Sequence, residues 1–205
     1  MKIIPASVEI ISPVDGEAIL KHIERCGRVC YKSEGKITEG SAEQFLQNII
    51  QRGHESVIEH YSFTARFVCD RGVSHEIVRH RLASYSQEST RYCNYSRDDF
   101  DGEITVIRPS YLAPSTRAWH IWYSACEAAE DAYFQLLDAG CSAQEARSVL
   151  PHSTKTEVVM TANLREWRHF FRLRTSPAAH PKMREVAQKL LEQVRQLIPV
   201  VFDDI

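Results

Sequence analysis

The segment YSFTARFVCD, residues 61–70, is the feature that most constrains the fold. Apolar residues alternate there with polar neighbours: Tyr61, Phe63, Ala65, Phe67 and Cys69. A period of two predicts a strand with one buried and one exposed face. The segment STKTEVVMTAN at 153–163 is also β-like, and the alternating N-terminus predicts a further strand. The chain therefore needs at least one sheet.

Helical patterns occupy most of the remaining chain. The expected helices cover residues 15–31, 41–53, 116–137, 164–174 and 181–198. Capping boxes Ser41/Gln44 and Ser142/Glu145 mark two helix starts, and Ser74 is expected to cap a short helix that runs into Arg79. With no repeat and no linker, we expect residues 1–205 to form a single α+β domain. Its mixed or antiparallel sheet would carry flanking helices and a long central helix.

Charge and cysteine usage exclude several classes of protein. The formal net charge is only -2, which argues against a general nucleic-acid binder, yet 18 of the 25 basic residues are arginine. Arginine suits bidentate contact with phosphate or carboxylate, so a few specific anions are expected as ligands. The six cysteines form no CxxC pair, which predicts neither a zinc site nor a disulfide framework. No stretch reaches the roughly 18 apolar residues of a membrane span, and we expect a cytoplasmic protein without membrane contact.

The segment RHRLASYSQESTRY, residues 79–92, gathers four cationic side chains among hydroxyls and amides: Arg79, His80, Arg81 and Arg91. A solvated surface turn and an anion cradle are both compatible with it. On a helix, Glu76, Arg79 and His80 would form one polar face, with Ile77 and Val78 turned inward. Arg81 would point elsewhere, so the helix end could hold two different anions. The segment from Ser84 to Arg91 is expected to be a polar loop.

Two further polar clusters leave alternatives open. On the helix at 164–174, Arg165, Arg168 and Arg172 share one face, whereas Arg174 lies on the apolar side and needs a salt bridge, a buried acceptor or an anionic ligand. The segment GHESVIEH, residues 53–60, contains histidine and glutamate but fits no HExxH pattern. We expect helix-capping and ring-contact roles for it, and no metal site.

Residues 79–92 resemble the RHRxxSxxxxSxRY signature of the flavin-dependent thymidylate synthases. GHESVIEH, EARSVLP at 145–151 and residues 163–174 are similar to other segments of that family. The resemblance covers roughly residues 25–180. It implies a homotetramer with FAD sites at subunit interfaces and a methyltransferase reaction. That reaction makes dTMP from dUMP with 5,10-methylenetetrahydrofolate and NADPH.

The resemblance also assigns roles to individual residues. The flavin set is Ser56, Arg79, His80, Arg81, Gln87, Asn163, Leu164, Arg165 and His169. The substrate set, which binds dUMP, is Glu76, Ile77, Val78, Arg79, Gln87, Glu88, Ser89, Thr90, Arg91, Arg147 and Arg174. Different chains would supply the two sets. Some family members have an acid in place of Gln87 and an asparagine in place of His169.

Within these sets, we expect Arg174 to stabilise negative charge at N3/O2 of the uracil. Ser89 would position the nucleotide rather than attack it, because no base is assigned to activate its hydroxyl, so the reaction would use no protein nucleophile. Two rival interpretations are a nucleic-acid-binding module, with Tyr85, Tyr92 and Tyr95 as stacking platforms, and an inactive flavin-binding scaffold. The colour of the protein and its dUMP-dependent oxidation of NADPH distinguish these three possibilities.

Overall fold

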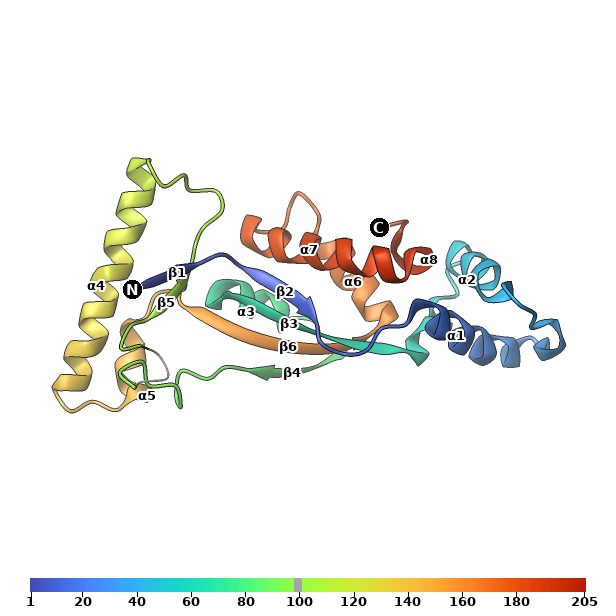
Figure 1. The fold of residues 1–205 in the computed structure, drawn as a ribbon, viewed down its shortest axis with the longest axis horizontal. Helices are drawn as coiled ribbons and strands as arrows, with labels where there is room; N and C mark the ends of the chain where they lie inside the picture. Colours follow the sequence, from blue (N-terminus) through green and yellow to red (C-terminus); the bar gives the residue numbers. More distant parts are fainter. Residues whose placement is uncertain (98–100) are drawn as a thin grey trace. The chain divides into compact units, whose positions relative to one another are not determined.

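A computed structural model describes residues 1–97 and 101–205 and shows an α+β fold with two sheets (Figure 1). The two-stranded sheet pairs β1 (Lys2–Ile4) with β5 (Thr105–Ile107) in parallel, so that Ile3 faces Val106. The four-stranded sheet has the order β2-β3-β6-β4. Its strands are β2 (Ser7–Ile10), β3 (Ser62–Asp70), β4 (Ala83–Gln87) and β6 (Lys155–Asn163).

The helices follow the expected segments closely. The α-helices are α1 (Gly16–Cys30), α2 (Ser41–Gln51), α3 (Arg71–Ile77), α4 (Arg117–Asp138), α5 (Ala143–Ala146), α6 (Leu164–Arg174), α7 (Pro181–Leu197) and α8 (Pro199–Phe202). Short 3-10 turns are η1 (Glu34–Lys36), η2 (Glu55–His60) and η4 (Arg147–Val149). Among the described residues, no helix is long and apolar enough to span a bilayer.

The chain divides into two compact units. The first unit contains residues 1–7, 67–79 and 86–158, and the second contains residues 8–66, 80–85 and 159–205. Strands β3, β4 and β6 each contribute residues to both units, so neither unit is one continuous piece of chain. The α+β class is confirmed, and the assignment of residues 1–205 to a single domain stays a prediction.

The core of the first unit lies between the small sheet and α4. Val106 of β5 and Tyr133 of α4 are fully buried there, and Ile3 of β1 packs against the same cluster. The N-terminal ammonium pairs with Glu103 at 2.9 Å and with Glu130 of α4 at 3.1 Å. Helix α4, the longest of the described helices, therefore presents its aromatic side chains partly to the core, as expected.

The core of the second unit is built on aromatic rings of α6. Trp167 stacks on Phe63 of β3 with ring centroids 4.6 Å apart, and its indole donates a hydrogen bond to the Phe63 carbonyl. Phe171 meets Phe202 of α8 edge to face at 5.6 Å. Because Phe63 is one of the alternating apolar residues of β3, the predicted buried face of that strand is confirmed.

The structure corrects two predicted helix starts. Ser41 does not cap α2, because it is the first helical residue after Gly40 and its hydroxyl donates to the buried carboxylate of Glu24 at 2.8 Å. Ser74 does not cap α3 either. Asp70 does, accepting a hydrogen bond from Val73 N at 2.7 Å, so Ser74 lies inside the helix. The Ser142/Glu145 capping box is confirmed.

The earlier start of α3 changes the surroundings of the RHR segment. The helix ends at Ile77, so Arg79 and His80 follow it instead of lying on its surface. Ile77 is fully buried as expected, but Val78 is 39% exposed and His80 is only 3% exposed, the reverse of the prediction. The expected loop from Ser84 is also wrong in its first half, because residues up to Gln87 form β4 beside β6.

Candidate functional site

The two predicted sets of site residues divide largely between the two units. The second unit contains most of the flavin set: Ser56, His80, Arg81, Asn163, Leu164, Arg165 and His169. The first unit contains most of the substrate set: Glu76, Ile77, Val78, Arg79, Arg147 and the stretch 87–91. Arg79 and Gln87 of the flavin set lie in the first unit, and Arg174 of the substrate set lies in the second. The chain passes from one unit to the other between Arg79 and His80, so the RHR segment contributes to both.

A cavity of about 770 Å³ lies beside α6 in the second unit, and we call it the α6 cavity. It is lined by Glu55, Glu59, Leu82, Asn163, Arg165, Glu166, His169 and Arg172. Three members of the flavin set, Asn163, Arg165 and His169, therefore share one cavity. Its volume lies within the roughly 300–1,000 Å³ that is usual for cofactor pockets.

The N-terminus of α6 gives this cavity a preference for anions. Asn163 caps the helix by accepting a hydrogen bond from Glu166 N at 2.9 Å. The first N–H groups of a helix and its dipole favour negative charge. Arg165 pairs with Glu59 at 2.5 Å, but their side chains are 53% and 41% exposed. An exposed pair contributes about 0–1 kcal/mol, so an anionic ligand can compete for this guanidinium.

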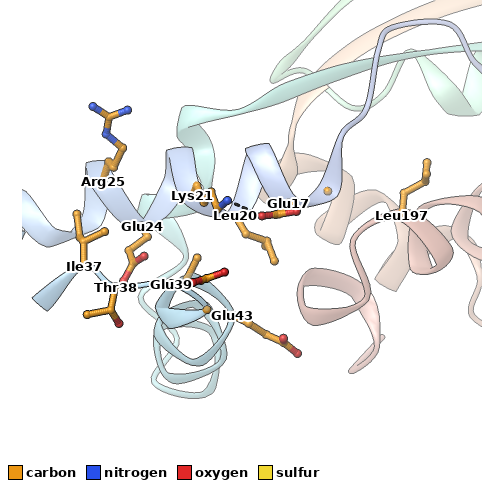
Figure 2. Close-up of a pocket in the computed structure, with 13 residues that line it drawn as sticks. Glu17, Leu20, Lys21, Glu24, Arg25, Ile37, Thr38, Glu39, Glu43 and Leu197 are labelled. Carbon is orange, nitrogen blue, oxygen red and sulfur yellow. Dashed lines mark hydrogen bonds and ion pairs between the residues drawn. The ribbon is translucent and has the colours of Figure 1, made fainter.

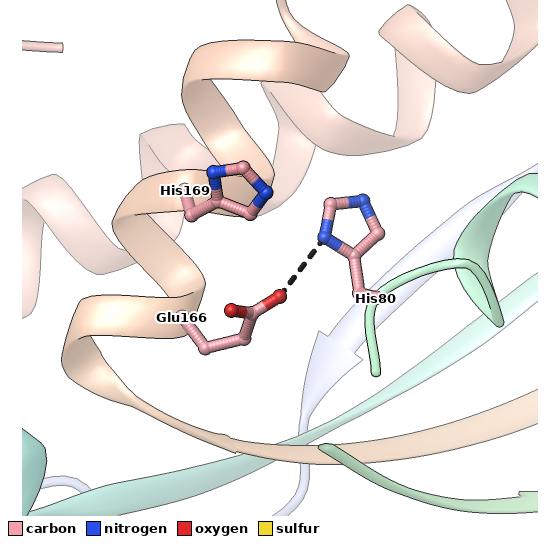
Figure 3. A group of neighbouring side chains, drawn as sticks. All are labelled: His80, Glu166 and His169. Carbon is pink, nitrogen blue, oxygen red and sulfur yellow. Dashed lines mark hydrogen bonds and ion pairs between the residues drawn. The ribbon is translucent and has the colours of Figure 1, made fainter. Parts of the chain in front are cut away.

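His80 is buried beside α6 and faces Glu166 and His169 of that helix (Figure 3). Its Nδ1 is 3.1 Å from Oε1 of Glu166, which is 6% exposed, and its Nε2 is 3.0 Å from Nε of Arg174. Burial lowers the pKa of His80, and the charges of Arg174 and His169 lower it further, although the hydrogen bond with Glu166 opposes them. The imidazole is therefore neutral around pH 7.

A second cavity, of about 450 Å³, lies beside η4 in the first unit, and we call it the η4 cavity. Its lining includes Arg71, His75, Thr90, Arg147 and His152. Arg147 Nη1 donates to the hydroxyl of Thr90 at 3.2 Å, which unites two members of the substrate set. Among the described residues, Arg71 Nη1 is buried without a hydrogen-bond partner. A buried guanidinium nitrogen of this kind favours an anion.

Other members of the substrate set are held by neighbouring side chains. The Gln87 amide donates to Ser74 Oγ at 3.0 Å and to Thr156 Oγ1 at 3.2 Å. Glu88 pairs with Lys155 at 2.9 Å. The Ser89 hydroxyl accepts a hydrogen bond from Arg91 N at 3.3 Å, while the Arg91 side chain is exposed. Ile77 and Leu164 are fully buried, so ligand contact through their side chains requires movement.

The segment GHESVIEH has a different role from the one expected. Glu55 pairs with Arg168 at 3.1 Å and with Arg172 at 3.0 Å, and Glu59 pairs with Arg165. The expected capping and ring-contact roles are therefore wrong for both glutamates. His54 Nδ1 lies 2.9 Å from the Tyr31 hydroxyl, within hydrogen-bond distance.

A third cavity, lined by residues of α1 and α2 among others, is less suited to an anionic ligand (Figure 2). Its volume is also about 770 Å³. Its charged lining contains Glu17, Lys21, Glu24, Arg25, Glu39 and Glu43, and it includes no member of either predicted set. Carboxylates outnumber cations there, which disfavours a phosphate-bearing cofactor or substrate.

Sequence reasoning missed several residues of these cavities. No sequence motif marks Arg71, His75 or His152. They line one cavity because β3 leads directly into α3 and the Arg71 N–H donates to the His152 carbonyl at 3.0 Å. Glu166 was also missed, although a carboxylate on the same α6 turn as the predicted Asn163 and Arg165 is a usable signal. Ser56, Arg79 and Arg81 are exposed and line neither the α6 nor the η4 cavity.

Comparison with known proteins identifies the family. Residues 16–200 match the family model described as Thymidylate synthase complementing protein. A flavin-dependent thymidylate synthase of Geobacter sulfurreducens is 36% identical over 201 residues, covering 91% of this chain and 85% of the relative. One from Pyrococcus horikoshii is 36% identical over 170 residues, covering 81% and 69% respectively.

The fold also has a solved counterpart. The UMP/dUMP methylase PolB from Streptomyces cacaoi, solved with 5-Br dUMP, superposes with a TM-score of 0.79 at 24% sequence identity. The match covers 99% of this chain and 96% of that chain, and it establishes a common fold. The family model and the sequence relatives together show that this chain belongs to the flavin-dependent thymidylate synthase family.

Proposed function

We propose that this protein methylates dUMP to dTMP, with 5,10-methylenetetrahydrofolate as the carbon donor and NADPH-reduced FAD as the source of hydride. The observation that carries the proposal is the α6 cavity, where Asn163, Arg165 and His169 of the flavin set share one wall in a chain of this family. As the resemblance implies, the protein would act as a homotetramer with its sites at subunit interfaces.

The α6 cavity fits the phosphate-bearing cofactor. The helix N-terminus capped by Asn163 and the displaceable guanidinium of Arg165 would hold the pyrophosphate. Arg81 and Ser56 are exposed and available for contact with the same ligand or with a neighbouring subunit. When bound, the reduced flavin supplies the hydride, so the side chains of this chain serve to bind and orient.

The η4 cavity fits the nucleotide phosphate. Arg147 and Thr90 form one donor pair, and Arg71 adds a buried nitrogen that lacks a partner among the described residues. Guanidinium groups bind phosphate oxygens through two parallel hydrogen bonds, which is stronger and more directional than contact with a single ammonium. Ser89 and Arg91, which follow β4 in the chain, would contact the nucleotide.

Arg174 would stabilise charge on the substrate base. The guanidinium is partly buried and permanently charged, so it can face an anion that develops at N3/O2 of the uracil without itself releasing a proton. A fixed donor directed at developing charge typically contributes about 100-fold or more to turnover. We expect Arg174→Ala to lose at least that much in kcat. Near-normal turnover with intact FAD and dUMP binding would remove this assignment.

The activity is tested directly with purified protein. We expect flavin absorption in the visible range, NADPH oxidation that depends on dUMP, and formation of dTMP that requires both dUMP and methylenetetrahydrofolate. A colourless protein with salt-dependent affinity for nucleic acid would instead indicate a nucleic-acid-binding module. Bound flavin without dUMP-dependent turnover would indicate an inactive scaffold.

The contribution of the η4 cavity is tested with a pair of variants. Arg147→Gln is expected to raise the KM for dUMP by about ten-fold or more, because a charge-assisted contact worth about 1.5–3 kcal/mol is lost. Arg117→Gln is the matched control, since Arg117 is exposed at the start of α4 and lines none of the three cavities. Equal KM values for the two variants would place the phosphate elsewhere.

A further inference from the structure

Three side chains of the second unit form a continuous hydrogen-bonded line. Glu166 lies in the first turn of α6, Arg174 is the last residue of that helix, and His80 lies between them in space. Oε1 of Glu166 is 3.1 Å from His80 Nδ1, and Arg174 Nε is 3.0 Å from His80 Nε2. Because Glu166 and His80 are 6% and 3% exposed, water competes little for these contacts.

The line determines the tautomer of His80. An arginine Nε can only donate a hydrogen bond, so His80 Nε2 must accept one and carry no proton. The single proton of the neutral ring then lies on Nδ1 and is donated to the Glu166 carboxylate. A doubly protonated ring would direct an N–H at the guanidinium N–H, which the geometry disfavours. The depressed pKa of His80 agrees with this assignment.

We propose that Glu166 is a positioning residue, which holds His80 as the Nδ1–H tautomer and through it orients the guanidinium of Arg174. A guanidinium is planar, so a hydrogen bond at Nε sets the direction of both Nη groups. Without the carboxylate, the imidazole ring can flip or change tautomer, and the guanidinium of Arg174 then loses its hydrogen-bond acceptor. This inference rests on the proposed function, in which Arg174 stabilises charge on the uracil.

A metal centre is the main alternative use of the same side chains. His80, Glu166 and His169 offer ligand atoms that all lie within 4.8 Å of one another. A metal would need a lone pair of His80, and the lone pair of the assigned tautomer points at the positively charged Arg174. Repulsion from that charge disfavours a divalent cation, so a hydrogen-bonded line explains the arrangement better.

The purely structural alternative is that Glu166 only stabilises the start of α6. A carboxylate in the first turn of a helix is favourable wherever it occurs. Glu17 likewise lies in the first turn of its helix, α1, and outside the proposed site, so Glu17→Ala reports this general effect. A loss of activity in Glu166→Ala that Glu17→Ala does not share therefore reports positioning.

The first test measures kinetics. We expect Glu166→Ala to lower kcat by about 10- to 100-fold, the range for a misoriented catalytic group, with the KM for dUMP changed by less than about three-fold. Glu166→Gln keeps an acceptor oxygen and should recover part of the loss. Unchanged kcat in Glu166→Ala, or a loss equal to that of Glu17→Ala, would overturn the inference.

The pH profile adds a readout that a structural role would not move. The groups that face His80 are Glu166, Arg174 and His169, while the Tyr85 hydroxyl donates to its carbonyl. Of these, Glu166 favours the protonated ring, so removing its carboxylate lowers the pKa of His80 further. The acid limb of the activity profile should therefore move to lower pH in Glu166→Ala. An unmoved limb would contradict the proposal.

The second test does not depend on turnover. Imidazole ¹⁵N spectra of the wild-type protein at pH 7, assigned with His80→Asn, should show His80 as the Nδ1–H tautomer. An Nε2–H or doubly protonated ring would overturn the inference even if the enzyme is active. Perturbation of these signals by substoichiometric Zn²⁺ would favour the metal centre instead. Wild-type protein with the expected tautomer but no dUMP-dependent activity would refute the proposed function and leave the hydrogen-bonded line intact.

Discussion

The fully buried guanidinium of Arg168 provides the sharpest test of the packing in the second unit. Its side chain is 1% exposed and meets Asp204 through two parallel hydrogen bonds of 2.6 Å each, and it also donates to Glu55 at 3.1 Å and to the Val201 carbonyl. Substituting Asp204→Asn keeps the shape of the partner but removes its charge and directs an amide N–H at one guanidinium nitrogen.

The expected loss of stability follows from this geometry. Breaking a fully buried ion pair costs about 3–5 kcal/mol, and a hydrogen bond to a charged group contributes about 1.5–3 kcal/mol. The lower end applies here, because the Asp204 side chain is 50% exposed and Glu55 still neutralises the guanidinium. We therefore expect a loss of about 2 kcal/mol. For a chain of this length, that lowers Tm by about 4–8 °C.

The assay is thermal denaturation of wild type, Asp204→Asn and Asp203→Asn. All three must be compared at one protein concentration and one flavin loading, because ligand and subunit binding shift Tm. Asp203 is the matched control, since it is the adjacent exposed acid and forms no ion pair with any residue in 1–97 or 101–205. We expect Asp203→Asn to stay within about 0.5 kcal/mol of wild type.

The pH dependence of the stability difference between wild type and Asp204→Asn provides a second test. The hydrogen bond from Arg168 holds the pKa of Asp204 below its ordinary value of 3.8. The carboxylate therefore stabilises the folded protein fully above that ordinary value, and the contribution is lost as pH falls through the lower pKa of the folded state. The gap between wild type and Asp204→Asn should be constant near neutral pH and close in acid. Equal Tm values for Asp204→Asn and wild type, or a gap that persists in acid, would refute the reasoning.

Three further predictions concern packing, titration and thiol chemistry. Gly27→Ala would place a Cβ 2.7 Å from the Phe45 ring and should destabilise the protein by about 1–2 kcal/mol in chemical denaturation, despite the better helix propensity of alanine. Burial lowers the pKa of His80, so the unfolded chain binds its proton more readily, and stability should fall as pH decreases from 6.5 toward that lower pKa. His80→Asn should show a smaller decrease over this window, and an equal decrease would exclude His80 as the cause. Exposed Cys30 should react with a thiol reagent in the native state, whereas Cys69, which is buried and has a raised pKa, should react only on unfolding, as peptide mass spectrometry can establish.

Local patterns predicted most of the secondary structure. The alternation in β3 and the helical spacing of α1, α4, α6 and α7 placed these elements correctly, because each pattern reflects one buried face along a short piece of chain. The start of α3 was misplaced, because Asp70 and Ser74 are both plausible caps and the choice depends on where β3 leaves its sheet. Capping residues alone could not distinguish these two starts.

Burial of charge was beyond the reach of helical periodicity. Arg168 shares a predicted face with Arg165 and Arg172, yet Arg168 is 1% exposed while the other two side chains are 53% and 46% exposed. The difference arises because Asp204 and the Val201 carbonyl, both distant in sequence, accept hydrogen bonds from Arg168. No pattern within residues 164–174 indicates that contact.

By itself, the sequence determined the family and the fold class, because the RHRxxSxxxxSxRY signature is long and specific and needs no tertiary contact to be recognised. The ligand-binding segments that it indicates stay a prediction. Only the tertiary structure decided which of those residues meet. It placed the buried His80 between Glu166 and Arg174. It also joined Thr90 to Arg147 in the η4 cavity, which Arg71 lines as well. These contacts join residues between 57 and 94 positions apart, and sheet pairing and helix packing determine them instead of local spacing.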